Sequence, residues 1–129
     1  MTPTRGERGA AAVEFALVVP LLLLLVLGIA EFGRAYNTSA TLASAARTGA
    51  RTMALENSAG AARTATQAAA TGLSLSTSQI AVTPSSCPAS STGSTTLVTV
   101  SITYPMTFVT GLFGSSVTLH GTGVMRCNG

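Results

Sequence analysis

The chain of 129 residues has few of the residue types from which enzymes build active sites. It contains one His and no Asp, and its four Glu are scattered along the sequence. Charged residues make up 9% of it, against roughly 25% in ordinary soluble domains. Trp is absent, and aromatic residues reach only 5%. This inventory argues against an acid–base pair, a metal site or a large catalytic core, so we expect no enzyme activity, no cofactor and no metal.

The positive charge of the chain is thinly spread. All seven basic residues are Arg, which gives a net charge of +3 and a pI near 9.5. They are dispersed along the chain: Arg5, Arg8, Arg34, Arg47, Arg51, Arg63 and Arg126. Because a surface that binds phosphates clusters its cations, we interpret these as solvated or membrane-flanking charges and expect no nucleic-acid partner.

An uncharged apolar run covers residues 15–30 and reads FALVVPLLLLLVLGIA. As a helix it measures about 24 Å, slightly less than a hydrocarbon core of about 30 Å. Residues 10–13 and Phe32 extend it to spanning length, and Glu14 then lies inside the apolar window. A lone carboxylate in lipid costs at least a few kcal/mol and is usually partnered or functional. Glu14 is therefore the first candidate functional residue.

Features on both sides of this run orient it in a membrane. The short stub before it carries Arg5, Arg8 and the amino terminus, which favours a cytoplasmic location. The C-terminal half is rich in Ser and Thr and holds both cysteines, Cys87 and Cys127, which favours its export. In an oxidising compartment these thiols can form one disulfide. We expect a single-pass protein of the cytoplasmic membrane, with its C-terminal domain outside.

The apolar run also fits a removable secretory signal. Gly28 and Ala30 place small residues before a cut at Glu31. The carboxylate of Glu14 at the start of the run and the helical pattern past Ala30 argue against this alternative. The alternative function is therefore a secreted or membrane-anchored module whose Ser/Thr-rich domain binds a surface or a carbohydrate.

After the apolar run, the sequence predicts a helix that continues to about residue 57. Mostly small side chains recur along it at alternating spacings of four and three, the period of one helix face. They are Phe32, Tyr36, Ser39, Ala43, Ala46, Ala50 and Met53. This seam packs either on the chain's own C-terminal domain or on similar helices of other copies. A break at 57–60 precedes a shorter helix over 61–71, with Gly72 as its cap.

Strand signals occupy the C-terminal half. They cover residues 79–83, residues 96–104 with Pro105 as the end, and residues 117–126. Gly121 and Gly123 are expected to weaken the last strand or to mark a bulge. The predicted fold class is α+β, with a long N-terminal helix and a small antiparallel sheet of about three strands. This sheet is too small to stand alone and needs the helix against it.

The stretch RGAAAVEF at residues 8–15 resembles the processing site of type IV prepilins. In that pattern Gly9 is the last leader residue and Ala10 the new amino terminus, while Glu14 and Phe15 become the fifth and sixth mature residues. The apolar run and the sequence AARTGAR at 45–51 resemble more narrowly the TadE-like pseudopilins of the tight-adherence (Tad, Flp) pilus system. The stretches VTVSITYP and VTLHGTGVMR also resemble the small sheet of that family.

This resemblance implies a minor, non-catalytic subunit that helps to assemble a thin adhesive pilus. Its implied partners are a prepilin peptidase, other pilin-like subunits, the Tad inner-membrane assembly proteins and membrane lipid. The implied organisation is a leader at 1–9, a transmembrane helix at 10–32, a helical extramembrane segment at 33–72 and a β domain at 73–129.

The resemblance also gives the residues of the apolar helix their expected roles. Cleavage after Gly9 leaves an amine four residues before Glu14. If a neighbouring subunit's amine pairs with this carboxylate, the pair sets the axial register between subunits. Alternatively, Glu14 snorkels unpaired to the interface. Pro20 removes a backbone donor and is expected to kink the helix, either as a bending point or as a tolerated distortion.

Overall fold

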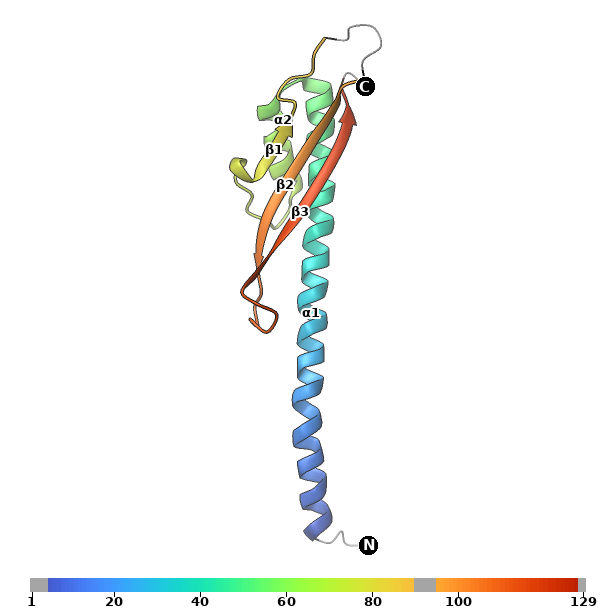
Figure 1. Cartoon of the computed structure of the whole chain (residues 1–129), viewed down its shortest axis with the longest axis vertical. Helices are drawn as coiled ribbons and strands as arrows, with labels where there is room; N and C mark the ends of the chain where they lie inside the picture. Colours follow the sequence, from blue (N-terminus) through green and yellow to red (C-terminus); the bar gives the residue numbers. More distant parts are fainter. Residues whose placement is uncertain (1–4, 90–94, 128–129) are drawn as a thin grey trace. The chain divides into compact units, whose positions relative to one another are not determined.

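The computed structural model describes residues 5–89 and 95–127 of the chain (Figure 1). The chain divides into two compact units, Met1–Arg34 and Ala35–Gly129. The elements in order are α1 (Arg5–Glu56), α2 (Ala59–Ala69), a short 3-10 helix η1 (Thr77–Gln79), β1 (Ile80–Thr83), β2 (Leu97–Thr107) and β3 (Ser116–Arg126). A long apolar helix, a second helix and a three-stranded antiparallel sheet confirm the α+β class predicted from the sequence.

In the first unit, α1 exposes the side chains of the apolar run. Every Leu and Phe from Phe15 to Phe32 is exposed, and no part of the most apolar window is buried. Leu, a strong helix former, supplies seven of the sixteen residues 15–30, and the helix persists through Pro20. Over the described residues, α1 is the one helix with the length and composition to cross a membrane.

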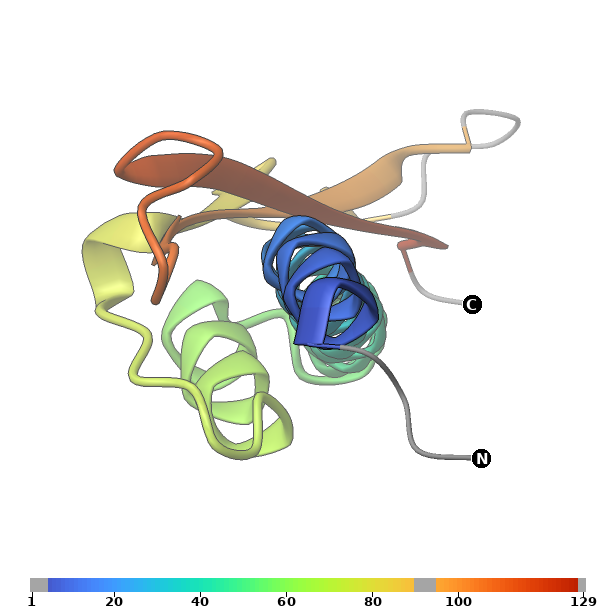
Figure 2. The same ribbon diagram turned by 90° about the horizontal axis from the view of Figure 1, so that it is seen from below.

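In the second unit, three antiparallel strands lie in the order β1-β2-β3. The central strand is β2, whose Ile102 pairs with Ile80 of β1 and with Gly121 of β3. Val98, Val100 and Ile102 are all buried, because alternate residues of a strand point to the same face. Figure 2 shows α2 and the later part of α1 (teal) on the same side of the sheet. The core of this unit therefore lies between one helical layer and one face of the sheet.

The two glycines of β3 allow this packing. A Cβ on Gly121 would lie 2.6 Å from the carbonyl carbon of Leu42, and one on Gly123 would overlap the backbone of Ala46. Both glycines are buried, and β3 pairs continuously with β2 around them. The expectation of a bulge is wrong: glycine is needed here because the backbone of α1 approaches the strand without room for a side chain.

The contact between α1 and α2 also depends on a glycine. A Cβ on Gly49 of α1 would overlap the hydroxyl of Thr66 in α2. Thr66 is fully buried, and its Oγ1 donates a hydrogen bond to the carbonyl of Ala62 at 2.7 Å. This bond satisfies the buried hydroxyl within α2, so the two helices can approach closely without an unpaired polar group.

The later part of the seam predicted along α1 packs on the chain's own second unit, one of the two alternatives expected from the sequence. Phe32 and Tyr36 are exposed, whereas Ala46, Ala50 and Met53 pack in the core of the second unit. The buried positions of this part of α1 are Thr38, Leu42, Ala45, Ala46, Gly49, Ala50, Met53 and Ala54. Large rings on this face would hold the helix away from β3, so close packing selects the small residues.

Two predicted boundaries in the second unit are also wrong. β2 continues through Pro105, which pairs with Thr118 of β3. The pairing of β1 with β2 ends at Ile102. At Pro105, the edge of β2 that faces away from β3 therefore has no strand partner, and a residue without an N–H group fits there. The second helix spans Ala59–Ala69 rather than 61–71, and its C-terminal cap is Ala70. Gly72, with φ of 78°, lies in the turn that follows.

Candidate functional site

The residues of the predicted processing site lie together on the exposed N-terminal part of α1. Gly9, Ala10, Glu14 and Phe15 are helical, and all four are exposed. No other part of the structure would obstruct a Cβ at Gly9 within 4 Å. Residues 1–4 of the predicted leader lie outside the described residues. The described part of this segment is thus accessible along one helix.

The geometry of α1 places Ala10 and Glu14 on the same helix face. Residues four apart in an α-helix are neighbours one turn along the axis, a rise of about 6 Å. An amine created at Ala10 would therefore lie within one turn of the Glu14 carboxylate. The pair contains no nucleophile–base arrangement, and the chemistry it offers is an ion pair, within one chain or between chains.

Pro20 lies eleven residues after Gly9 in the same helix. Its nitrogen cannot donate to the carbonyl of Ala16, so one helical hydrogen bond is missing at this point. The helix continues on both sides of it. The expected kink therefore stays a prediction.

The structure adds one buried carboxylate that the sequence reasoning did not select. Glu31 is only 5% exposed, and its Oε2 lies 4.0 Å from an Nη1 of Arg34. The signal in the sequence is an acid and a base three residues apart at the end of an apolar run, where such pairs face each other on a helix. The ion pair reduces the penalty for placing this carboxylate out of water.

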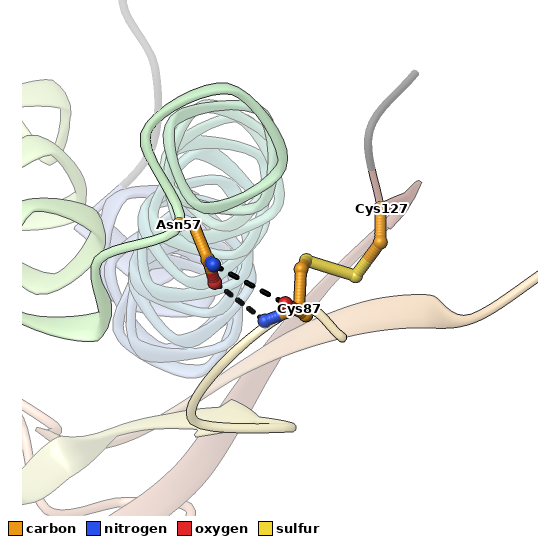
Figure 3. Close-up of a disulfide and its surroundings, with 3 residues drawn as sticks. All are labelled: Asn57, Cys87 and Cys127. Carbon is orange, nitrogen blue, oxygen red and sulfur yellow. Dashed lines mark hydrogen bonds between the residues drawn. A yellow bond between two sulfur atoms is a disulfide. The ribbon is translucent and has the colours of Figure 1, made fainter. Parts of the chain in front are cut away.

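A second group of residues joins three distant segments of the second unit (Figure 3). Cys87 and Cys127 form a disulfide with their Cα atoms 5.6 Å apart. Asn57 Nδ2 donates to the carbonyl of Cys87 at 3.2 Å, and the Cys87 amide donates to Asn57 Oδ1. The end of α1, the loop after β1 and the end of β3 are thereby linked. In the chain-entropy view, a crosslink over 40 residues stabilises the fold by about 4 kcal/mol.

Asn57 has this role because it also terminates α1. Its φ of 49° lies in the left-handed region, which Asn tolerates better than most residues. Its amide donates back to the carbonyl of Met53 at 2.9 Å, and Ser58 then caps α2 by accepting from the Ala61 amide at 3.2 Å. The sequence signalled a helix break here, but not the partner of the Asn57 side chain thirty residues away.

Ionisable side chains are sparse in the second unit. Among residues 5–89 and 95–127, no three His, Cys, Asp or Glu side chains lie close enough to hold a metal ion together. His120 is exposed on β3. Arg63 of α2 donates from Nε to the carbonyl of Ile80 at 3.3 Å, which ties the helix to β1.

These features define a class of protein: a small α+β domain continuous with an exposed apolar N-terminal helix, held by packing and one disulfide. Residues 9–51, about a third of the chain, match the family model described as TadE-like protein. The resemblance drawn from the sequence is confirmed over this segment, which begins at Gly9 and includes the AARTGAR stretch. Neither curated proteins nor solved structures give a match.

The match over this segment indicates a protein related to the Tad pilus. The long apolar helix agrees with a membrane-anchored protein of this kind.

Proposed function

We propose that this chain is a minor, non-catalytic pilin-like subunit that helps to assemble a Tad (Flp, type IVc) pilus. Residues 10–32 anchor it in the cytoplasmic membrane, with the leader 1–9 in the cytoplasm. The helical segment 33–72 and the β domain 73–129 lie outside. Its partners are a prepilin peptidase, other pilin-like subunits and the Tad inner-membrane assembly proteins.

One observation carries this proposal: the exposed apolar stretch 10–30 of α1 contains one carboxylate, Glu14, one turn after Ala10, in the segment that matches TadE-like proteins. Apolar surface of this extent is unfavourable in water, so the helix needs lipid or a protein partner to cover it. A carboxylate inside the lipid-facing run needs a cation. Cleavage after Gly9 supplies that cation at the new amino terminus.

The mechanism follows from the difference between the two interactions along the helix. Apolar side chains attract neighbouring helices at any axial offset, so they provide affinity without register. The Glu14 carboxylate and a neighbour's Ala10 amine pair at one offset, and leaving either charge unpaired in an apolar bundle costs several kcal/mol. The missing hydrogen bond at Pro20 allows α1 to bend as a subunit moves from the bilayer into an assembly.

Support for the anchor over a removed secretory signal comes from the helix itself. α1 continues without interruption through Gly28, Ala30 and Glu31, where the alternative cut would fall. The disulfide between Cys87 and Cys127 agrees with a domain that folds in an oxidising compartment.

The test of processing is mass spectrometry of the mature amino terminus. We expect Ala10 as the first residue and the full leader in Gly9→Leu, because a bulky residue at the cut blocks the peptidase. Gly6→Leu is the matched control, since Gly6 lies in the same exposed helix and has equally open surroundings. A chain that starts at Glu31 would support the secretory alternative, and an intact wild-type leader would contradict the processing step.

The test of register uses Glu14 itself. We expect Glu14→Val to be processed normally but to reduce piliation strongly, while Glu14→Asp keeps the charge and part of the function. Glu7→Val is the control, because it removes an acid from the same helix but from the leader. Normal piliation by Glu14→Val, measured by electron microscopy of sheared filaments, would remove the register argument.

A further inference from the structure

The turn between β2 and β3 forms an exposed apolar tip, which we define as residues 108–115. Val109, Leu112 and Phe113 are 80%, 51% and 60% exposed. The tip is closed by a hydrogen bond from the Phe108 amide to the Ser115 carbonyl at 3.2 Å. The rings of Phe108 and Phe113 meet edge to face with their centroids 6.5 Å apart. The tip is therefore an ordered turn that displays apolar side chains.

The hairpin segment around the tip carries no charged residue. From Tyr104 to Leu119 the chain has no Asp, Glu, Lys or Arg. Glycines with φ of 66° at Gly111 and 105° at Gly114 make the turn. Natural hairpins that face water usually place charged or polar residues at such a tip. This tip instead has the composition of a segment that enters an apolar environment.

The direction of β3 sets where the tip lies in the second unit. Gly121 lies against Leu42 and Gly123 against Ala46, so β3 runs in the same direction as α1 (Figure 1). From Gly121 back to Ser116, the strand covers roughly 17 Å at about 3.3 Å per residue. From Leu42 back to Ala35, the helix covers about 10 Å. The tip therefore lies at the end of the second unit where Ala35 begins.

Chain continuity identifies what lies at that end. Residue 32 is the last apolar residue of the membrane-spanning run, and Ala35 follows three residues later. When the run is in a bilayer, the Ala35 end of the second unit is held at the lipid–water interface. The exposed Val109, Leu112 and Phe113 are then the apolar side chains that the β hairpin presents at this end.

We propose that the tip 108–115 inserts into the interfacial layer of the same membrane that holds α1. Apolar and aromatic side chains on a polar body bind this layer a few ångströms below the headgroups. The tip would act as a second membrane contact that limits the tilt of the second unit against the bilayer before assembly. This inference rests on the membrane anchor of the proposed function, but not on processing or on entry into a pilus.

The test uses the absence of Trp from the chain, which makes any introduced Trp a single reporter. The full chain is placed in vesicles of phosphatidylethanolamine and phosphatidylglycerol, with quencher-labelled lipids at shallow or deep positions. Val109→Trp reports on the tip, and Leu24→Trp reports on the anchor. His120→Trp is the control, because His120 lies on the same hairpin, is exposed and is several residues from the tip.

We expect Val109→Trp to show blue-shifted emission and several-fold stronger quenching by shallow labels than His120→Trp. Quenching of Leu24→Trp by deep labels with no quenching of Val109→Trp would overturn the inference and leave the anchor intact. If neither reporter is quenched, both the anchor and the tip contact are wrong. A blue shift of Val109→Trp that disappears on dilution with unlabelled lipid, without lipid quenching, would assign the tip to a second protein copy and overturn the lipid contact.

Discussion

The two parts of α1 use opposite kinds of residue for opposite purposes. In the first unit the helix carries large apolar side chains, and these are exposed. In the second unit the same helix buries mainly small residues, such as Ala45, Ala46 and Ala50. Hydrophobicity therefore marks the part that needs an apolar solvent, whereas small size marks the part that packs closely against protein. A hydropathy profile alone would place the core in the wrong part of the helix.

The difference lies in what approaches each part. Lipid is fluid and fills the spaces around any side chain, so Leu is suitable at every position of the first unit. A strand or a helix, in contrast, has a fixed backbone. Gly121 and Gly123 of β3 meet α1 with no room for an added carbon, and so does Gly49 of α1 where it meets α2. The second part of α1 therefore depends on side-chain volume, and the first does not.

The largest expected effect comes from filling the contact between β3 and α1. Gly123→Val would place side-chain atoms in the backbone of Ala46, and we expect it to destabilise the second unit by about 3 kcal/mol or more. The measurement is amide hydrogen exchange of β2 and β3 in the full chain in detergent micelles.

The matched control for Gly123→Val is Thr122→Val, which places the same Val side chain on the exposed face of the same strand and replaces only a hydroxyl by a methyl group. Its effect should stay within about 0.5 kcal/mol. Membrane association should be unchanged in both variants. Equal protection of the strands in the two variants would contradict the close packing of α1 on β3.

A matched pair of substitutions compares the two parts of α1 directly. Leu42→Ala removes a fully buried side chain and should lower the stability of the second unit by about 2–5 kcal/mol. Leu22→Ala, the same change twenty residues earlier, alters a side chain that is 54% exposed. It should leave exchange of the strands unchanged and reduce membrane insertion by only a few tenths of a kcal/mol. Loss of strand protection in Leu22→Ala would mean that the apolar run packs on protein rather than lipid.

Much of the fold was predictable because its signals are local. The apolar run 15–30 is continuous in the sequence, and the alternation of Val98, Val100 and Ile102 marks the central strand directly. The processing motif around Gly9 and Glu14 is likewise a contiguous pattern. These features need no knowledge of the rest of the chain.

The errors arose where a distant partner decides the outcome. Gly121 and Gly123 resemble a strand defect until Leu42 and Ala46, about eighty residues earlier, are placed against them. Pro105 resembles the end of a strand in the sequence. The structure shows why it is tolerated within β2: the pairing with β1 reaches only to Ile102, so β1 needs no N–H group from residue 105. Phe32 and Tyr36 belong to the predicted seam by spacing, yet they are exposed, because spacing does not show how far along the helix the sheet packs.

Within the second unit, Asn57 gives a smaller expected effect than the core substitutions, because it ends α1 with a specific contact to the loop at Cys87. Asn57→Gly keeps the left-handed backbone but loses both partly buried hydrogen bonds to Cys87, which should cost about 1 kcal/mol. Asn57→Ala also places a Cβ in the left-handed region and should cost about 1 kcal/mol more.

Asn57→Asp separates the two hydrogen bonds, because it keeps the acceptor for the Cys87 amide and loses the donor to the Cys87 carbonyl. Its effect should not exceed that of Asn57→Gly, provided that the backbone bond to Met53 persists. Exchange of the amide of Cys87 is the most direct measurement: it should rise in the Gly and Ala variants and stay low in the Asp variant. Equal exchange in all three would mean that the disulfide alone holds this loop, and that the end of α1 is no more specifically bound to its surroundings than the apolar run is.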